Sequence, residues 1–516
     1  MVLNRKRLAV CGIPAYLLKN SMITRFQVDG FKNLVGVDLR FGPFTCIAGI
    51  NGVGKSNLFD AIRFLGALAS RPLMDAAATV RGGLRAADVR AIFHRTGAIC
   101  GDTIRFDVEM IVPKEVVDDV GQSARATTTF LRYELELGLK IDSDTGGPQL
   151  EIRREELSPI NRSTAARQIC FKHSPKWRTS VVLGARRGGH YVSTADDNGR
   201  RVIRRHQDGG SRGKPAPALA SSLRGTIVSV AQADTPTLLC ARREMQSWMQ
   251  LQLEPGALRE PSPLSAARHL HPNGEGLPAT LFRIAHESKN AEATYGHMAN
   301  RLAELVRDVR RIDVERNERL DLLTLLLTDR EGTEHAARSL SDGTLRFLAL
   351  TVLEMDPKSY GVLCLEEPEN GIHPDRIGSM VSLLKDIGFD PEHPADADNP
   401  LRQVIVNTHS PLVVGECPDD SLILAKAVED RVDGRLCGRV VFRGVADTWR
   451  TKNVDGGDCV AKGDLVAYLF PGSLRQPAES PSRPRPSGSQ HRRIRERTDL
   501  QTDWLPGFER LRVAEE

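Results

Sequence analysis

The segment "FTCIAGINGVGKSNLFDAIRFL", residues 44–65, decides the fold. An apolar run ends at glycines, a lysine and a serine follow, and apolar residues then recur at helical spacing. The middle of the segment, "GINGVGKS" at residues 49–56, matches the pattern G-x-x-x-x-G-K-[ST]. Glycines let successive backbone N–H groups face phosphate oxygens at the start of a helix. The segment therefore predicts a nucleoside-triphosphate site between a strand and a helix.

Two side chains of this loop carry the chemistry. Lys55 would reach the β and γ phosphates of ATP, and the hydroxyl of Ser56 would ligate Mg²⁺. ATP and Mg²⁺ are thus the expected cofactors. The other predicted nucleotide-binding residues of the loop are Gly49, Asn51, Gly52, Gly54 and Asn57.

Length and composition set the outer limits. The chain has 516 residues, a net charge of +5 and 40% hydrophobic residues, which is typical of a globular protein with more than one structural unit. The charge permits a local basic surface but does not indicate a nucleic-acid binder by itself. The nine cysteines form no CxxC pair, and no apolar run is long enough to cross a bilayer. We expect a cytoplasmic protein without a membrane segment.

The first half of the chain favours β-structure. Two strand patterns lead into the glycine loop, and strict apolar alternation at 104–110 and 131–139 predicts half-buried antiparallel strands. A hairpin signal follows in "ARRGGHYV", residues 185–192.

The second half favours helices and then an α/β alternation. Helices are predicted around "TLLCARREMQSWMQLQL" (237–253) and "HMANRLAELVRDVRRI" (297–312). Between 340 and 414, helical segments alternate with the buried strands "GVLCL" and "QVIVNTHS". This alternation predicts a parallel α/β core.

A pair of carboxylates ends the first of these strands. In "GVLCLEEPENGIHP", residues 361–374, Glu366 and Glu367 follow four apolar residues. A strand beside the phosphate loop would bring one carboxylate to Mg²⁺ and the next to the attacking water. Two glutamates after an apolar run are usually a solvated strand end, but an upstream phosphate loop favours the catalytic interpretation.

Two further motifs allow a structural or a functional interpretation. "SLSDGT", residues 339–344, is an ordinary N-cap, yet its free N–H groups and hydroxyl could also hold a phosphate. "VIVNTHSP" places His409 directly after a buried strand, where a histidine is more often structural.

The order of these motifs resembles the ATP-binding-cassette class of ATPases: Walker A, signature, Walker B and switch histidine. "FKNL" at 31–34, "ENGIHP" at 369–374 and "THSP" at 408–411 narrow the similarity to predicted AAA-type ATPases related to RecF, SMC and OLD-family proteins, here without a Toprim nuclease domain. The resemblance spans roughly residues 22–425. It implies an α/β P-loop NTPase fold, an ABC-type ATPase head with an antiparallel β lobe and a helical insertion.

The resemblance also implies residue roles. Glu367 would be the general base, His409 would sense the γ-phosphate, and Glu366 would join Ser56 at Mg²⁺. Ser341 and Gly343 would contact the γ-phosphate held by a second subunit, so that ATP closes a head-to-tail homodimer and hydrolysis opens it.

The sequence departs from the family at two positions and leaves a third unassigned. Glu366 replaces the usual aspartate, and His373 stands at the usual D-loop aspartate. For the Q-loop glutamine, Gln232 in "TIVSVAQAD" is a candidate, and an ordinary loop residue is an equal alternative.

These patterns predict six segments along the chain. They are an N-terminal extension (1–21), ATPase lobe I with Walker A (22–160), an insertion of hairpins and helices (161–315), ATPase lobe II with signature, Walker B and switch histidine (316–425), a C-terminal extension (426–470) and a mostly disordered tail (471–516).

Two functions fit this sequence. The first is an ATP-hydrolysing ATPase whose ATP-driven dimer is a clamp or sensor on DNA or RNA, in DNA repair or antiviral (phage) defence. Arginine-rich patches in "ARRGG" and "GRRVIRRH" could then contact phosphates, although such runs are often only solvated surface. The alternative is an ATP-dependent regulatory switch that controls a partner effector protein, a toxin or nuclease, without binding nucleic acid.

Overall fold

The computed structural model describes residues 21–80, 88–97, 99–142, 146–184, 189–208, 217–267, 269–306, 308–356, 358–359, 361–432, 435–452 and 459–469. The chain divides into two units, Met1–Phe470 and Pro471–Glu516, and the description concerns the first. Most of the expected N-terminal extension and all of the expected tail lie outside the described residues.

A six-stranded sheet forms the centre of the nucleotide-binding part. Its order is β14 (Trp248–Leu251), β19 (Val362–Glu366), β20 (Gln403–Thr408), β3 (Phe44–Ala48), β21 (Leu422–Val432) and β22 (Arg435–Gly444). All neighbouring strands pair in parallel except β21 and β22, which are antiparallel. Every residue of β3 and β20 is buried, as expected for a sheet covered on both faces. The predicted parallel α/β core is confirmed.

Helices cover the two faces of this sheet differently. Successive strand residues point to opposite faces, so Val362 packs in one apolar cluster and Leu363 in another. The first cluster contains α1 (Lys55–Leu68), and the second contains α9 (Asp342–Met355) and α10 (Ile377–Ile387). The predicted stripe of α1 is buried: Leu58, Ala61, Ile62 and Leu65.

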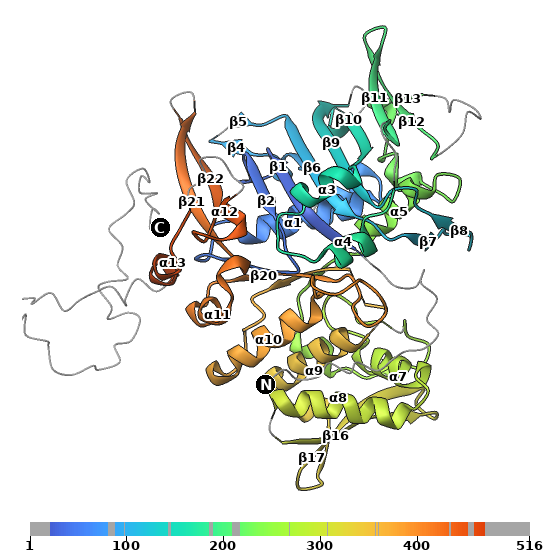
Figure 1. Cartoon of the computed structure of the whole chain (residues 1–516), viewed down its shortest axis with the longest axis vertical. Coiled ribbons are helices and arrows are strands. Elements are labelled where there is room, and N and C mark those ends of the chain that lie inside the picture. Colours follow the sequence, from blue (N-terminus) through green and yellow to red (C-terminus); the bar gives the residue numbers. More distant parts are fainter. Residues whose placement is uncertain are drawn as a thin grey trace, which may run out of the picture. The chain divides into compact units, whose positions relative to one another are not determined.

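An eight-stranded antiparallel sheet lies over α1 (Figure 1). Its order is β13 (Ala218–Leu219), β12 (Arg200–Arg205), β11 (Val192–Asp197), β10 (Pro148–Pro159), β9 (Phe130–Ile141), β6 (Thr103–Ile111), β1 (Met22–Asp29) and β2 (Val37–Arg40). The alternating segments predicted as antiparallel strands are β6 and β9, which are neighbours. Phe106 of β6 lies 6.1 Å from Phe64 of α1, ring centre to ring centre, and so joins the sheet to the helix.

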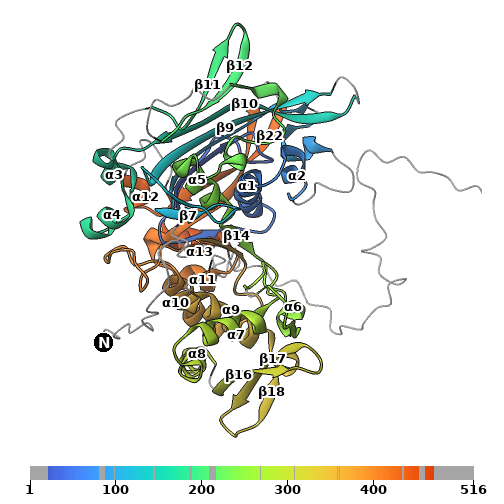
Figure 2. The same ribbon diagram turned by 90° about the vertical axis from the view of Figure 1, so that its right-hand side faces the viewer.

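One hairpin of this sheet joins β11 to β12, and only part of the hairpin predicted at 185–192 falls within the described residues. Residues 185–188 of the predicted hairpin lie outside the described residues, and Val192 begins β11. The chain turns at Asn198 and Gly199, where φ is 54° and 76°. Asn-Gly with two positive φ angles suits a two-residue turn between twisted strands. Figures 1 and 2 show β11 and β12 extending away from the rest of the sheet.

Both long predicted helices end early. The segment predicted as a helix at 237–253 contains α5 (Pro236–Gln246) and then strand β14. The helix predicted at 297–312 is α8 (Ala291–Leu305), which ends before strand β16 (Val309–Asn317) begins. The apolar spacing of Val309 and Ile312 fits a helix, but Ile312 pairs with Leu327 of β17 (Leu322–Asp329). Pairing with a partner strand overrides the local period here.

The remaining elements extend these two cores. The shorter strands are β4 (Arg95–Thr96), β5 (Ile99–Cys100), β7 (Glu115–Val117), β8 (Ser123–Arg125), β15 (Ser262–Pro263) and β18 (Glu334–Ala336). The other helices are α2 (Leu73–Ala77), α3 (Arg162–Gln168), α4 (Pro175–Val181), α6 (Pro255–Arg259), α7 (Leu277–Glu287), α11 (Pro411–Glu416), α12 (Trp449–Lys452) and α13 (Lys462–Leu469). In the part of the chain that the structure describes, no helix combines the length and the apolarity needed to cross a bilayer.

One buried ion pair connects α7 to the end of α9. Nη2 of Arg283 lies 2.6 Å from Oδ2 of Asp356, and both side chains are almost fully buried. The same guanidinium contacts the exposed carboxylate of Glu287 at 3.1 Å. Asp356→Asn should lower the free energy of unfolding by about 3 kcal/mol, because it removes the buried counter-charge of Arg283 and leaves only the exposed Glu287. Urea denaturation measures this loss.

The control for this substitution is Glu287→Gln. It removes a carboxylate from the same arginine at the surface, where an ion pair is worth about 1 kcal/mol or less. Equal losses for the two variants would contradict the importance of burial at this pair.

Candidate functional site

The predicted phosphate loop joins the end of β3 to the start of α1. Gly52 and Gly54 have φ angles of 83° and 109°, which side chains other than glycine rarely adopt. A Cβ on Gly54 would lie 2.3 Å from Nδ2 of Asn33, and a Cβ on Gly49 would lie 2.6 Å from the carbonyl oxygen of Ala425. The loop thus needs glycine at two positions because other atoms approach its backbone closely.

Asn33, in the "FKNL" segment, supports this loop from below. Its Nδ2 donates to the carbonyl of Val53 at 3.0 Å, and its Oδ1 accepts from Nδ2 of Asn57 at 2.8 Å. Asn57, predicted to bind nucleotide, therefore contacts the scaffold through its amide. Asn51 is exposed at the top of the loop.

Lys55 lies under the loop. Its ammonium donates to the carbonyl oxygens of Gly49 at 2.6 Å and Ile50 at 2.9 Å. Burial lowers the pKa of Lys55, although the charges of Glu367 and Glu369 act in the opposite direction. The ammonium is thus held by two carbonyl groups of the loop backbone.

Ser56 and Glu366 meet at the carboxyl ends of the parallel strands. The Ser56 hydroxyl donates to Oε2 of Glu366 at 3.2 Å, and Nε2 of Gln250 donates to Oε1 at 2.5 Å. A hydroxyl and a carboxylate are the hard oxygen donors that Mg²⁺ takes from proteins, usually one or two of them, with phosphates and waters completing the shell. These residues therefore fit the predicted ion. No cluster of three or more His, Cys, Asp or Glu suited to a metal occurs among the described residues.

Glu367 is held by two side chains that donate hydrogen bonds. Nδ2 of Asn370 lies 2.9 Å from Oε2, and Nδ1 of His409 lies 2.8 Å from Oε1. Burial raises the pKa of Glu367, but these hydrogen bonds outweigh it and the net pKa is below the ordinary value. The carboxyl group is therefore ionised at neutral pH, as a general base must be.

The backbone at Glu367 is unusual as well. Its φ is 43°, in the left-handed region that non-glycine residues rarely enter, and its N–H donates to the carbonyl of Asn407 at 3.0 Å. The turn directs the side chain toward His409 of the neighbouring strand end. Behind it, the buried Glu369 accepts from the Thr408 hydroxyl at 2.5 Å, and burial raises its pKa.

The predicted signature motif forms the start of α9. Ser341 is the N-cap, and its Oγ accepts from the N–H of Thr344 at 3.2 Å. Gly343 packs so closely that a Cβ would lie 3.0 Å from the carbonyl oxygen of Gly371. Among the described residues, no hydrogen bond links Ser341 or Gly343 to the phosphate loop. The structure thus brings Ser56, Glu366, Glu367 and His409 together, and it places Gly343 beside Gly371 in the turn that follows Glu367.

The sequence alone did not identify Gln250. The candidate Gln232 is an exposed residue of the loop before α5, and its carbonyl accepts from the N–H of Thr235 at 3.0 Å. Gln250 is the glutamine that reaches Glu366. The sequence pattern predicts a helix over 237–253, so it does not place Gln250 on a strand next to the Walker B strand β19. His373, at the D-loop position, is exposed and caps a short turn through the N–H of Asp375.

Comparisons with known proteins agree with this arrangement. Residues 242–415 match the model of the family described as "AAA domain, putative AbiEii toxin, Type IV TA system". No curated protein matches the chain.

Three solved structures share parts of the fold. They are the Smc head bound to the C-winged helix domain of ScpA (15% identity, 82% of this chain and 98% of that chain, TM-score 0.44), the Smc head with an extended coiled coil bound to the C-terminal domain of ScpA from Pyrococcus furiosus (11%, 82% and 96%, 0.40), and the SMC head domain from Thermotoga maritima (12%, 81% and 98%, 0.34).

The family match gives the second half of the site the character of an AAA domain, and the structure has a mixed α/β fold that includes a large antiparallel sheet. The match covers the second half of the site, from α5 to α11, and the phosphate loop precedes it in the chain.

Glu367→Gln should retain ATP binding and lose at least about 100-fold in turnover, because an amide cannot take a proton from water. Phosphate release measures turnover, and calorimetry with ATP and Mg²⁺ measures binding. Glu366→Gln should instead weaken the effect of Mg²⁺ on ATP affinity. If Glu366→Gln alone stops turnover while Glu367→Gln hydrolyses ATP normally, the two roles are reversed.

Proposed function

We propose that the protein binds and hydrolyses ATP with Mg²⁺ as a cytoplasmic, ATP-driven homodimer. The observation that carries the proposal is the group formed by Ser56, Glu366, Glu367 and His409 at one edge of the sheet. Bound Mg²⁺ would neutralise charge that develops on the phosphates. The phosphate loop and Lys55 would hold the β and γ phosphates, with Ser56 and Glu366 at the ion.

Glu367 performs the proton transfer in this proposal. Its lowered pKa keeps it ionised, and Asn370 and His409 fix the orientation of its two oxygens. It accepts the proton of the attacking water as the water approaches the γ-phosphate. His409 would then contact both Glu367 and the γ-phosphate. This position suits a residue that senses whether the γ-phosphate is present.

The signature residues complete the site from a second subunit. Ser341 is exposed at the start of a 14-residue helix, where free N–H groups and the helix dipole favour an anion. Among the described residues, neither Ser341 nor Gly343 forms a hydrogen bond with the phosphate loop, which leaves both able to contact the nucleotide of a partner. ATP held between two subunits would close the dimer, and hydrolysis would open it.

The dimer acts, in this proposal, as a clamp or sensor on nucleic acid in DNA repair or antiviral defence. A continuous connection from the antiparallel sheet to the site supports a sensing role. Asp208, just after β12, accepts from the N–H of Thr237 at 3.0 Å in the first turn of α5. The chain leaves α5 directly into β14, where Gln250 contacts Glu366. A ligand bound to the hairpin strands β11 and β12 would therefore be connected to the predicted metal ligands through a single helix, α5.

A second function is favoured by the family description, which names a toxin and a toxin–antitoxin system. In that case the protein is an ATP-dependent switch that controls a partner effector, a toxin or nuclease, and does not bind nucleic acid. The same closure of two ATP-bound subunits would then hold or release a protein.

Two measurements on the purified protein separate these functions. ATP turnover and fluorescence anisotropy are followed with single-stranded and duplex DNA and RNA at several salt concentrations. A nucleic-acid clamp should bind with an affinity that falls steeply with salt. A regulator of an effector should show no such binding and should co-purify with one stoichiometric protein partner.

Ser341→Arg tests the dimer. The arginine should leave ATP binding by one subunit intact, because the phosphate loop lies elsewhere, and should prevent closure over a shared nucleotide. Light scattering with ATP and Mg²⁺ should give a monomer mass for this variant and a dimer mass for Glu367→Gln.

The matched control is Ser163→Arg, which adds the same side chain on the exposed surface of α3. It should dimerise like the unmodified protein. An ATP-independent mass for every variant would contradict ATP-driven dimerisation, provided that subunit mixing excludes a constitutive oligomer.

A further inference from the structure

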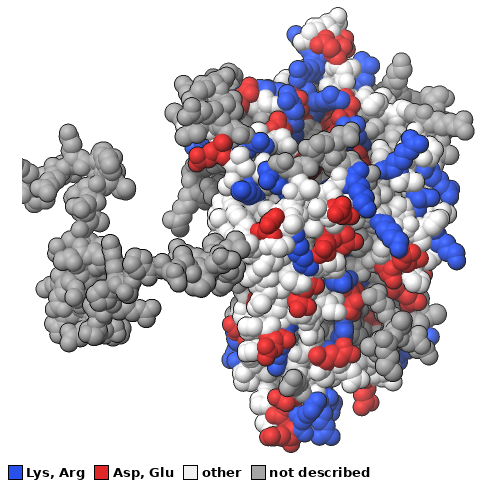
Figure 3. Space-filling model, turned by 60° about the vertical axis from the view of Figure 1, so that its left-hand side comes forward, with Lys and Arg blue, Asp and Glu red and all other residues white. Residues whose placement is uncertain are grey.

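Strand β12 carries three arginines whose charges are not neutralised by neighbours. Arg200, Arg201 and Arg204 are exposed, and none of them pairs with a carboxylate among the described residues. The side chain of Arg201 donates to the carbonyl oxygen of Arg153 at 3.3 Å, which leaves its charge uncompensated. Figure 3 shows blue side chains gathered at the hairpin end of the molecule, at the top of the view, with red ones among them.

The acidic residues of the hairpin offset part of this charge but form no ion pair with these arginines among the described residues. Asp196 and Asp197 lie opposite Arg201 and Arg200 in the strand register. However, Oδ1 of Asp196 accepts from the N–H of Gly199 at 2.9 Å, and Oδ1 of Asp197 accepts from Nδ2 of Asn198 at 3.2 Å. These carboxylates thus shape the turn.

The adjacent surface of the same sheet is different. Three of its arginines are paired with acids on neighbouring strands: Arg132 with Asp107 at 2.5 Å, Arg154 with Glu134 at 3.6 Å and Arg105 with Glu136 at 3.2 Å. A polyanion would have to displace a carboxylate at each of these positions and would meet no such competitor on β12. Arg200, Arg201 and Arg204 of β12, unlike these three arginines, form no ion pair among the described residues.

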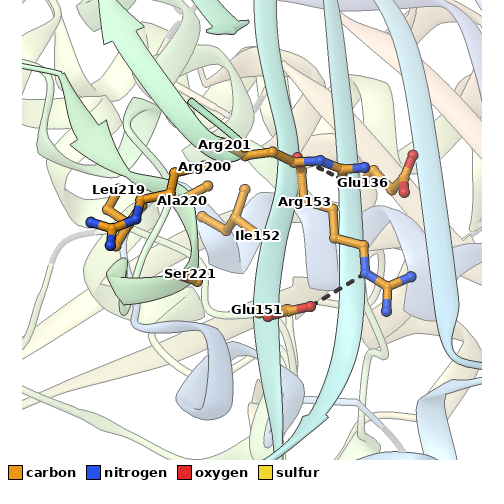
Figure 4. Close-up of a pocket in the computed structure, with 10 residues that line it drawn as sticks. Glu136, Glu151, Ile152, Arg153, Arg200, Arg201, Leu219, Ala220 and Ser221 are labelled. Atoms are coloured by element: carbon orange, nitrogen blue, oxygen red, sulfur yellow. Dashed lines mark hydrogen bonds and ion pairs between the residues drawn. The ribbon is translucent and has the colours of Figure 1, made fainter. Parts of the chain in front are cut away.

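A cavity of about 480 Å³ opens beside Arg200 and Arg201 of β12 (Figure 4). Its size lies within the range of small-ligand pockets, roughly 300–1,000 Å³. Ile152 of β10 is buried in the wall of the cavity, and Leu219 and Ala220 contribute further apolar surface. Arg200 and Arg201 line it from the start of β12.

The polar wall of this cavity suits a base and not a phosphate. Glu136 and Glu151 line it and are paired with Arg105 at 3.2 Å and Arg153 at 3.4 Å, so a phosphate would have to compete with carboxylates for these arginines. Their oxygens can, however, accept N–H groups from the edge of a nucleobase. The guanidinium of Arg153, fixed by the Thr103 hydroxyl at 2.7 Å, adds a planar group on which a base can stack.

We infer that β12 and this cavity bind a single-stranded polynucleotide, with one base in the cavity and the flanking phosphates on Arg200 and Arg204. These two residues are four positions apart on one strand, which separates them by roughly 13 Å along an extended backbone. A base in a duplex is stacked and paired and cannot enter, so single strands or unpaired ends are the ligand. The inference rests on the nucleic-acid function proposed above and names its ligand class.

The experiment uses the full chain and fluorescein-labelled single strands of roughly 12 nucleotides, a usual site size. The double variant Arg200→Ala/Arg204→Ala should bind at least about 10-fold more weakly than the unmodified protein. Its dependence of log affinity on log salt should be shallower by about 1.4, because two phosphate contacts are lost. DNA and RNA strands are both measured to distinguish the two sources of the ligand.

The matched control is Arg132→Ala/Arg154→Ala. It removes the same charge from the neighbouring surface of the sheet, where the arginines are already paired, and should change the affinity less than about 3-fold. Circular dichroism and urea denaturation show whether each variant is folded.

Base insertion has its own test. Ser221→Trp places an indole at the rim of the cavity and should weaken binding of a normal strand but not of a strand with abasic sites. The unmodified protein should prefer the normal strand to both the abasic strand and the duplex.

The outcomes separate the inference from the function on which it rests. If the protein binds single strands but both double variants bind equally well, the inference is wrong and the nucleic-acid function stands. Equal affinity for normal, abasic and duplex ligands would likewise overturn it. If no DNA or RNA binds with or without ATP, both fail and the effector switch is favoured.

Discussion

Parallel pairing of β3, β20 and β19 is the constraint on which the site depends. Residues that follow each strand meet at one edge of the sheet because the strands run in the same direction. The backbone pairing even continues beyond the strands, since the N–H of Gly49 donates to the carbonyl of Thr408 and the N–H of Glu367 to the carbonyl of Asn407. Segments more than 300 residues apart, such as Ser56 and Glu366, are thereby brought to hydrogen-bond distance.

The electrostatics of this edge follow from its partial burial. Lys55 is held by two neutral carbonyl acceptors, while Glu367 and Glu369 raise its pKa against the effect of burial. A phosphate would replace neutral acceptors with charged ones, and charge-assisted hydrogen bonds are roughly twice as strong. The two glutamates differ because Glu367 receives hydrogen bonds from two side chains, whereas Glu369 is more deeply buried and its pKa is raised.

The predictable parts of the structure are those in which local chemistry leaves one choice. The phosphate loop needs glycine where φ is positive, and the strict alternation of β6 and β9 fits only a half-buried strand. The helices at 237–253 and 297–312 were wrong at their ends because apolar residues three apart suit either structure until a partner strand decides. Gln250 was missed for the same reason: β14 has four residues and exists through its pairing with β19. The contact between Glu367 and His409 depends on the tertiary fold, which local sequence patterns do not determine. The order of the motifs along the chain nevertheless indicated that both residues belong to one site.

Helix α5 connects the antiparallel sheet with both halves of the site. At its start Thr237 is held by Asp208, and near its end Nε of Arg242 and Nε2 of Gln246 donate to the carbonyl of Ala69 at the C-cap of α1. Helix α1, which begins with Lys55 and Ser56, is therefore attached to α5. Strand β14, which contacts Glu366, is attached to the same helix. A displacement of α5 would therefore move both Ser56 and Glu366. The distance between these two residues determines whether both can ligate one metal ion. The antiparallel sheet is thus joined to the chemistry through the backbone of a single helix.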